Sequence, residues 1–263
     1  MRVALCQITS TPDPVENAEQ VRASVAEAVT AGASLVVFPE ATMARFGTRL
    51  KDVAEPLDGP WATVISAIAE AAGVLVIAGM FTPAGDGRVY NTLLVTGRGK
   101  SIGYDKIHLY DAFGFQESRT VAPGGELVSV DVEGVKIGLA TCYDIRFPEL
   151  FQAHGEAGAA AVVVPASWGA GEGKREQWEL LVRARALDSG CWVLGCGQAD
   201  PATSGIETKP GVPTGIGYST IADPFGRVHD QLGPGPGILV ADIDPKRAEE
   251  SRQATAVLAN RRL

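Results

Sequence analysis

The feature that most constrains the fold of this chain is a set of short, wholly apolar runs that stop abruptly at a polar residue or a proline. Leu35 to Phe38 is one such run, and Pro39 and Glu40 follow it at once. A strand buried on both faces has this continuous apolar pattern, and a proline cannot continue a sheet ladder. Similar runs occupy residues 3–8, 74–78, 135–140, 160–164 and 191–195, and helical spacing appears at 15–30, 61–72, 148–155 and 174–189. This alternation predicts an α/β fold with a buried sheet and helices outside it.

Hairpin signals interrupt the alternation. Gly97-Arg98-Gly99 separates two predicted strands at 88–96 and 100–106, and Glu133-Gly134 separates strands at 127–132 and 135–140. Further strands are predicted at 217–222, 227–231 and 238–243, before a last helix at 246–252. The Gly/Pro-rich stretches 201–214 and 233–237 are interpreted as loops, because no composition break accompanies them. The pattern therefore predicts one domain over residues 1–263 with a mixed sheet, and it leaves the number of sheets open.

Composition narrows the function classes. Of the 263 residues, 23 are basic and 31 acidic, giving a net charge of −8, which argues against binding to nucleic acid or to an anionic membrane. No apolar window is long enough for a membrane span, and the apolar start is too short for a signal peptide, so a cytoplasmic location is predicted. No metal-ligand spacing or phosphate-binding loop appears, so neither a metal nor a cofactor is predicted. Cys6, Cys191 and Cys196 lie in apolar runs and are predicted to be buried strand thiols.

Cys142 differs from the other cysteines because it follows an apolar strand and precedes a predicted helix. A nucleophile at such a turn projects its side chain and has the N–H of the next residue, Tyr143, beside it as an oxyanion donor. A thiol needs a base or a positive field to become a good nucleophile. A structural buried cysteine is the alternative interpretation.

Histidine is the usual base, and the chain has three. His154 is predicted to lie on a helix surface and His229 to be structural, whereas His108 remains a neighbour of the predicted site. Glu40 is the other candidate, because a carboxylate at the end of a buried strand is costly to place and burial moves it toward general-base behaviour. Lys106 closes the predicted strand 100–106, where an ammonium can stabilise a thiolate and a developing oxyanion.

Three segments together resemble the nitrilase (carbon–nitrogen hydrolase) superfamily. They are Val-Val-Phe-Pro-Glu40, Gly-Tyr-Asp-Lys106-Ile-His-Leu and Cys142-Tyr-Asp-Ile-Arg-Phe-Pro-Glu-Leu, in the family's order of Glu, Lys and Cys. Supporting pieces are Tyr90-Asn91-Thr92, Phe115-Gln-Glu117-Ser, the stretch from Trp178 to Asp188, and the stretch from Ser219 to Gly226. The branch that holds omega-amidases and deaminated glutathione amidases is the most similar.

The resemblance implies a four-layer α-β-β-α sandwich that forms a homodimer and needs no cofactor. It implies that Glu40 takes a proton from Cys142, that the thiolate attacks an amide carbonyl, and that Lys106 and the N–H of Tyr143 hold the oxyanion. Ammonia then leaves a thioester, which water hydrolyses. By the same resemblance Glu117 orients Lys106. The implied partner is a small-molecule amide.

The chain also departs from those relatives around the predicted pocket. The loop from His108 to Glu117 is compact, Gln177 and Tyr218 stand where a histidine is common, and residues 169–175 carry charges. Lys174, Arg175 or Arg146 could pair with a substrate carboxylate, and the alternative is a solvated loop. Competing functions are an N-carbamoyl amino acid hydrolase, a catalytically idle binding member of the family, and a redox sensor at Cys142.

Overall fold

The computed structural model describes residues 1–112, 114–209 and 211–262. Within them the strands form two mixed sheets. Sheet one has the strand order β12-β1-β2-β3-β4-β5, from β1 (Arg2–Gln7), β2 (Leu35–Val37), β3 (Leu75–Pro83), β4 (Val89–Gly97), β5 (Lys100–Asp105) and β12 (Gly237–Asp242). Sheet two has the order β11-β10-β9-β8-β7-β6, from β6 (Ser129–Val132), β7 (Val135–Leu139), β8 (Ala161–Ala166), β9 (Trp192–Gly197), β10 (Thr220–Ala222) and β11 (Val228–Gln231).

Each sheet has a parallel centre and antiparallel flanks. Strands β1, β2 and β3 run parallel in sheet one, and β7, β8 and β9 run parallel in sheet two. In the flanking hairpin β4–β5 the last paired residues are Gly97 and Lys100, and the turn lies between them. In the hairpin β6–β7 the turn lies between Val132 and Val135. Both hairpins were predicted from their glycine turn signals.

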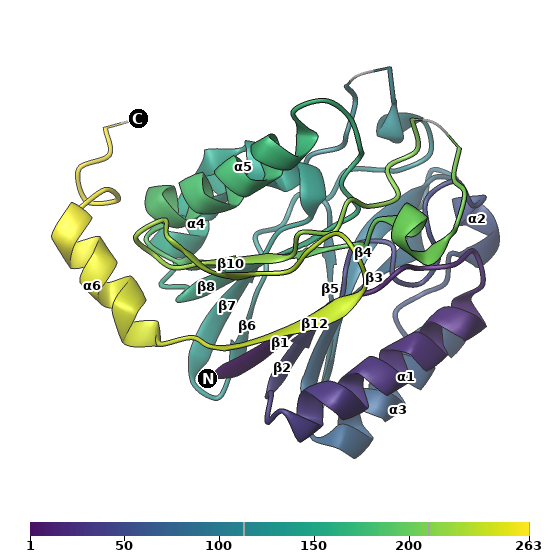
Figure 1. Cartoon of the computed structure of the whole chain (residues 1–263), viewed down its shortest axis with the longest axis horizontal. Coiled ribbons are helices and arrows are strands. Elements are labelled where there is room, and N and C mark those ends of the chain that lie inside the picture. The colour runs from purple at the N-terminus through teal and green to yellow at the C-terminus, as the bar shows by residue number, and fades with distance from the viewer. Residues whose placement is uncertain (113, 210, 263) are drawn as a thin grey trace.

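Helices cover the outer faces of both sheets (Figure 1). Helices α1 (Pro14–Thr30) and α3 (Pro60–Ala72) lie on sheet one, and α4 (Pro148–Glu156) and α5 (Lys174–Ser189) lie on sheet two. Helix α6 (Pro245–Thr255) follows β12, and the short pieces are α2 (Leu50–Val53), η1 (Glu117–Arg119), η2 (Cys142–Arg146) and η3 (Pro201–Ser204). The layers are those of an α-β-β-α sandwich, which confirms the predicted fold class.

The main core lies between the two sheets, where aliphatic side chains of both inner faces are completely buried. Sheet one contributes Val3, Leu5, Leu35, Val37, Ile77 and Leu93, and sheet two contributes Ile137, Leu139, Val163 and Leu194. Burying one such side chain stabilises the fold by about 1.5–3 kcal/mol. Because strand residues alternate between faces, the neighbouring residues Val36 and Val162 pack under the helices instead. The central strands are therefore apolar on both faces, as their sequence predicted.

Local signals set the helix ends. The Asp13 carboxylate accepts from the N–H of Val15 at 2.8 Å and caps α1, and Asp244 accepts from the N–H of Lys246 at 3.0 Å and caps α6. Proline occupies the first position of both helices, where its fixed φ suits the helix and its missing N–H costs nothing. Helix α3 ends at Gly73, whose φ of 68° is the left-handed conformation typical of a C-terminal glycine.

The structure corrects the prediction for His154. It was expected on a helix surface, but it lies in α4 with 0% of its area exposed, and its Nε2 is 3.0 Å from the carbonyl oxygen of Leu139. Burial lowers the pKa of this imidazole. Gly138 in β7 makes the room, because a Cβ at that position would lie 2.6 Å from the histidine ring. Helical spacing alone placed the histidine on the wrong face.

Candidate active site

Glu40 lies just after β2 and is almost completely buried, with 1% of its area exposed. Three donors meet its carboxylate: Oε1 accepts from Asn91 Nδ2 at 2.7 Å and from Lys106 Nζ at 3.1 Å, and Oε2 accepts from the N–H of Ser167 at 2.8 Å. Gly79 of β3 allows this turn, since a Cβ there would lie 2.4 Å from the N of Ala41. The donors compensate for a charge that burial would otherwise penalise.

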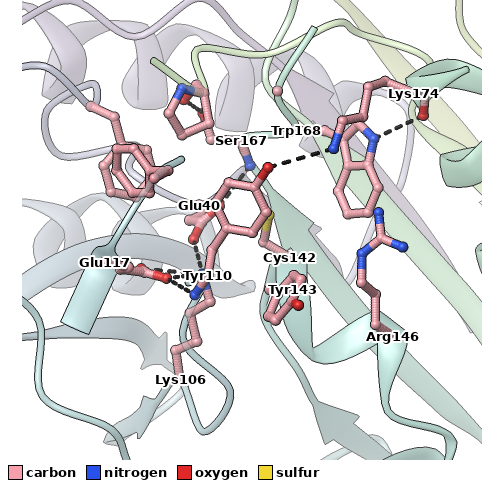
Figure 2. Close-up of a pocket in the computed structure, with 14 residues that line it drawn as sticks. Glu40, Lys106, Tyr110, Glu117, Cys142, Tyr143, Arg146, Ser167, Trp168 and Lys174 are labelled. Carbon is pink, nitrogen blue, oxygen red and sulfur yellow. Dashed lines mark hydrogen bonds and ion pairs between the residues drawn. The ribbon is translucent and has the colours of Figure 1, made fainter. Parts of the chain in front are cut away.

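Lys106 follows β5 and places its ammonium between two carboxylates (Figure 2). Nζ lies 3.1 Å from Oε1 of Glu40 and 2.9 Å from Oε2 of Glu117, and all three side chains are at most 3% exposed. Burial disfavours the ammonium, but Glu117 and Glu40 outweigh that effect and raise the pKa of Lys106 well above its ordinary value. Lys106 therefore carries a positive charge at neutral pH and cannot serve as a base.

Asn91 is a second bridge between the two acids. Its Nδ2 donates to Glu40 at 2.7 Å and to Oε1 of Glu117 at 3.1 Å, and its backbone oxygen accepts from the N–H of Lys106 at 2.9 Å. Glu117 is held further by the N–H of Tyr110, which donates to Oε2 at 2.7 Å. The two acids, the lysine and the amide form one buried hydrogen-bonded group.

Cys142 opens the η2 turn after β7 and has a φ of 47°, in the left-handed region that non-glycine residues seldom adopt. Its side chain points toward Glu40 from the opposite sheet (Figure 2). Burial and then the Glu40 charge raise the pKa of this thiol well above its usual value, while Lys106 acts in the opposite direction. Cys142 is accordingly a thiol at neutral pH. The thiolate that the sequence suggested Lys106 could hold is not the favoured form.

These residues line one pocket of about 390 Å³, measured with its open mouth. Its lining comprises Glu40, Phe46, Lys106, Tyr110, Phe115, Glu117, Cys142, Tyr143, Arg146, Ser167, Trp168, Gly169, Lys174 and Pro213. The structure thus brings Glu40, Lys106, Glu117, Cys142 and Tyr143 together in one pocket. Five of the lining residues are aromatic and five are charged. Apolar walls with convergent polar groups are typical of a small-molecule site.

Two of the three predicted cations line the same pocket. The Arg146 guanidinium lies over the ring of Trp168 at 5.2 Å and donates to Oε1 of Gln177 at 2.7 Å. Lys174 Nζ lies 3.5 Å from the Tyr110 hydroxyl, and burial followed by the charge of Arg146 lowers the pKa of Lys174. Arg175 is not among the lining residues.

Arg175 pairs with Glu179 on the outside of α5. Its Nε lies 2.9 Å from Oε1 of Glu179, and its guanidinium stacks over the ring of Tyr218 at 4.0 Å. This is the solvated arrangement that the sequence left open as the alternative.

Cys6, Cys191 and Cys196 are each 0% exposed, as predicted. Cys6 and Cys196 lie in β1 and β9, whereas Cys191 lies one residue before β9. Among the described residues, no group of three His, Cys, Asp or Glu side chains could hold a metal ion. None of the helices in the described part of the chain is long and apolar enough to cross a membrane.

Sequence reasoning gave no role to three residues in or beside the site: Asn91, Ser167 and Asp144. Asn91 stood in a quoted motif, so its position was visible although its role was not. Ser167 contributes only a backbone N–H, which no side-chain pattern reveals. Asp144 lies in the η2 turn two residues after Cys142, is completely buried, and takes part in four hydrogen bonds through its carboxylate.

Comparison with known proteins identifies the family. The model of the carbon-nitrogen hydrolase family matches residues 2–253. Hydrolase Rv0480c of Mycobacterium tuberculosis is 55% identical over 99% of this chain and 95% of its own length. The deaminated glutathione amidase of Escherichia coli O157:H7 is 35% identical over 100% and 97% of the two chains, and the mouse omega-amidase is 34% identical over 99% and 95%.

Solved structures give the same result. Saccharomyces cerevisiae Nit3, a member of branch 10 of the nitrilase superfamily, superposes with a TM-score of 0.86 at 27% identity, covering 100% of this chain and 97% of Nit3. A mutant of a Nesterenkonia amidase, with the acetamide moiety of fluoroacetamide covalently added at its active-site cysteine, has a TM-score of 0.80 at 26% identity and covers 97% and 95%. The chain belongs to the carbon-nitrogen hydrolase family, within the nitrilase superfamily.

Proposed function

We propose that this hydrolase is a cysteine-dependent amidase that converts a small carboxylic-acid amide to the acid and ammonia through a thioester. The observation that carries the proposal is the meeting of a thiol, a carboxylate and a charged ammonium in one buried pocket. Cys142 is the nucleophile, Glu40 the general base and Lys106 the oxyanion stabiliser. Glu117 holds Lys106 in place.

Proton transfer and attack are coupled in this scheme, because the resting Cys142 is a thiol. Glu40 takes the thiol proton as Sγ forms a bond to the amide carbon, and the carbonyl π electrons move to oxygen. The Lys106 ammonium and the N–H of Tyr143 stabilise the oxyanion. Its collapse breaks the C–N bond, and ammonia leaves with the proton held by Glu40. Water then attacks the thioester, Glu40 accepts a water proton and returns it to sulfur, and the acid is released.

The comparisons support the same chemistry. Two relatives at 34–35% identity are an omega-amidase and a deaminated glutathione amidase. In a mutant of the Nesterenkonia amidase, the acetamide moiety of fluoroacetamide is covalently added at the active-site cysteine. That adduct shows a reactive cysteine in the related amidase, which supports Cys142 as the nucleophile here.

We further propose that the substrate carries an anionic group away from its amide. Arg146 and Lys174 line the pocket wall beside Trp168, whereas Glu40 and Glu117 are occupied by Lys106. The like charge of Arg146 disfavours the Lys174 ammonium, and a bound carboxylate would relieve that repulsion. An amide at Cys142 and a carboxylate at the two cations would fix the direction in which the substrate enters.

The primary test is ammonia release from a panel of small amides, N-carbamoyl amino acids and nitriles, with Cys142→Ala measured in parallel. We expect release from ω-amides of keto acids or related carboxylates, and no release by the variant. Release only from carbamoyl compounds would replace the amidase proposal with a carbamoylase. Silence across the panel with unreactive Cys142 would indicate an idle binding member.

The anionic subsite needs a separate comparison. Arg146→Met and Lys174→Met should raise KM for an anionic amide about tenfold or more and leave KM for an uncharged amide of similar size within twofold. Arg175→Gln is the matched control, because Arg175 is a neighbouring cation outside the pocket lining. Unchanged KM for the anionic amide in both variants would remove the subsite proposal.

Three properties remain predictions from the sequence and its resemblance: one domain over residues 1–263, a homodimer and a cytoplasmic location. Sedimentation of the full chain would measure the oligomeric state. A monomer that is fully active would contradict the homodimer.

A further inference from the structure

The Asp144 carboxylate has no part in the proposed reaction, yet it is completely buried beside the site and hydrogen-bonded at both oxygens. It is 0% exposed and accepts four hydrogen bonds. Oδ2 accepts from the Tyr104 hydroxyl at 2.7 Å and from the N–H of Thr141 at 2.9 Å. Oδ1 lies 2.9 Å from the backbone N of His108 and 2.8 Å from its Nδ1. Both groups of donors belong to segments that carry proposed catalytic residues.

In the sequence, two of these donor residues flank Lys106 and the third directly precedes Cys142. Tyr104 lies two residues before Lys106 and His108 two residues after it, and Thr141 directly precedes Cys142. Burial, and then the Asp144 charge, raise the pKa of Tyr104 well above its usual value, so its hydroxyl keeps its proton and donates. An ionised Asp144 can only accept, which assigns a proton to Nδ1 of His108.

Three of the four bonds, those from Tyr104 and His108, cross between the two sheets. Lys106 follows β5 of sheet one, and Cys142 follows β7 of sheet two. The core between the sheets is apolar packing, which is non-directional and does not by itself fix the offset of one sheet against the other. Another polar link across them at the site is the bond from the N–H of Ser167 to Glu40. Charge-assisted hydrogen bonds are directional and short, so they can fix that offset.

Cys142 also needs local support. Its φ of 47° is a strained value for a residue with a Cβ, and such values persist only when the surroundings hold them. The bond from the N–H of Thr141 to Asp144 closes the turn from both sides of Cys142. Removing the acceptor would free the turn to relax.

We propose that Asp144 is a positioning residue that sets the separation and orientation of the Lys106 ammonium and the Cys142 thiol by bonding to both segments at once. This inference rests on the proposed function for its catalytic meaning. The geometric claim concerns the thiol and can be measured without any turnover. Asp144 itself touches no reacting atom.

The test compares Asp144→Asn with Asp223→Asn. Asp223 is a matched control, because it is also buried, at 5% exposed, and also accepts four bonds, from the N–H groups of Phe225 and Arg227 and from two nitrogens of Arg247. Those donors are not among the residues of the catalytic pocket. Both variants lose a buried acceptor charge, so both should lose stability.

Two readouts separate positioning from stability. For folded protein at 25 °C, Asp144→Asn should lower kcat about 10²-fold with KM within about threefold, as expected for misplaced reacting groups. It should also slow alkylation of Cys142 by iodoacetamide at least tenfold, measured by mass spectrometry. Asp223→Asn should leave both rates within twofold of wild type. Tyr104→Phe, which removes one of the four bonds, should give an intermediate loss and serves if Asp144→Asn does not fold.

The outcomes are distinguishable. Asp144→Asn or Tyr104→Phe with wild-type alkylation and turnover would overturn the positioning role and leave the amidase proposal standing. A wild-type protein that hydrolyses no amide, but whose Cys142 alkylation still falls in Asp144→Asn, would support positioning and count against the proposed function. Equal losses in Asp144→Asn and Asp223→Asn would mean a purely structural effect and would also overturn it.

Discussion

Lys106→Met is the perturbation whose consequence can be worked out furthest. In the described structure, Lys106 is the cation within bonding distance of Glu40 and Glu117, at 3.1 and 2.9 Å. Without it two buried carboxylates would face each other across Asn91 Nδ2, which is 2.7 Å from one and 3.1 Å from the other. Removing one partner of a buried ion pair costs about 3–5 kcal/mol. We expect that loss in the free energy of unfolding at pH 8.

The loss should shrink as the pH falls. Two like charges this close cannot both stay ionised, so the folded variant takes up a proton that the unfolded chain, with glutamates near pKa 4.3, does not hold at neutral pH. Stability linked to such a proton is present at low pH and disappears as the pH rises, at up to about 1.4 kcal/mol per pH unit. Lowering the pH from 8 to 5 should therefore restore at most about 4 kcal/mol.

Wild type should lack this slope. The folded pKa of Lys106 is raised, so its contribution is complete below the ordinary lysine value and is lost only as the pH rises through the higher folded value. Urea denaturation at pH 5, 6, 7 and 8 measures the difference between the variant and wild type. The double variant Lys106→Met/Glu117→Gln should be more stable at pH 8 than Lys106→Met alone. Lys136→Met is the control for loss of a lysine charge, because Lys136 is exposed. A loss that is equal at all four pH values would refute the charge argument.

Two further predictions concern the thiol and the bridging amide. Because burial and Glu40 raise the pKa of Cys142, less than about 1% of this residue should be thiolate at pH 7. The difference in absorbance at 240 nm between wild type and Cys142→Ala should therefore show no thiolate band at that pH. A thiolate band that titrates near pH 6 would contradict the coupled proton transfer. Asn91→Ala should cost about 3 kcal/mol of stability and lower kcat about tenfold, because both acids lose a donor. Asn17→Ala is its control, since Asn17 is equally buried and donates to the oxygens of Thr11 and Met43 at 2.9 Å; equal kcat values in the two variants would show that the bridge is only structural.

Much of the fold was predictable because buried parallel strands have a continuous apolar pattern that few other elements share. The predicted strand ends were wrong where hydrogen-bonded pairing with a neighbouring strand, rather than residue composition, decides where a strand ends. Strand β3 continues to Pro83, past the predicted end at 78, because it pairs with β4 up to Val89. Strand β10 begins only at Thr220, three residues later than predicted. The two-sheet arrangement itself came from the resemblance, since alternation of strands and helices does not count sheets.

The candidate site was predictable where a side chain has an ionisable or nucleophilic group and stands in a motif. Glu40, Lys106, Glu117 and Cys142 satisfy both conditions, and they meet in one pocket. Contributions through the backbone, such as the N–H of Ser167, leave no mark in the sequence. The sequence does not determine that Cys142 is a thiol, because its protonation depends on the balance between burial, the charge of Glu40 and the charge of Lys106.

The charges of the pocket imply a direction for the proposed substrate. Glu40, Glu117 and Lys106 together carry a net charge of −1 while Cys142 is a thiol, and this group would repel an anion. Arg146 and Lys174 lie on another part of the pocket wall and would attract one. An amide with a carboxylate tail then has one favourable orientation, with its neutral amide at the thiol and its charge at the cations. Reversing it would place the carboxylate against two buried acids, so the same electrostatics that bind the substrate would also exclude attack on its wrong end.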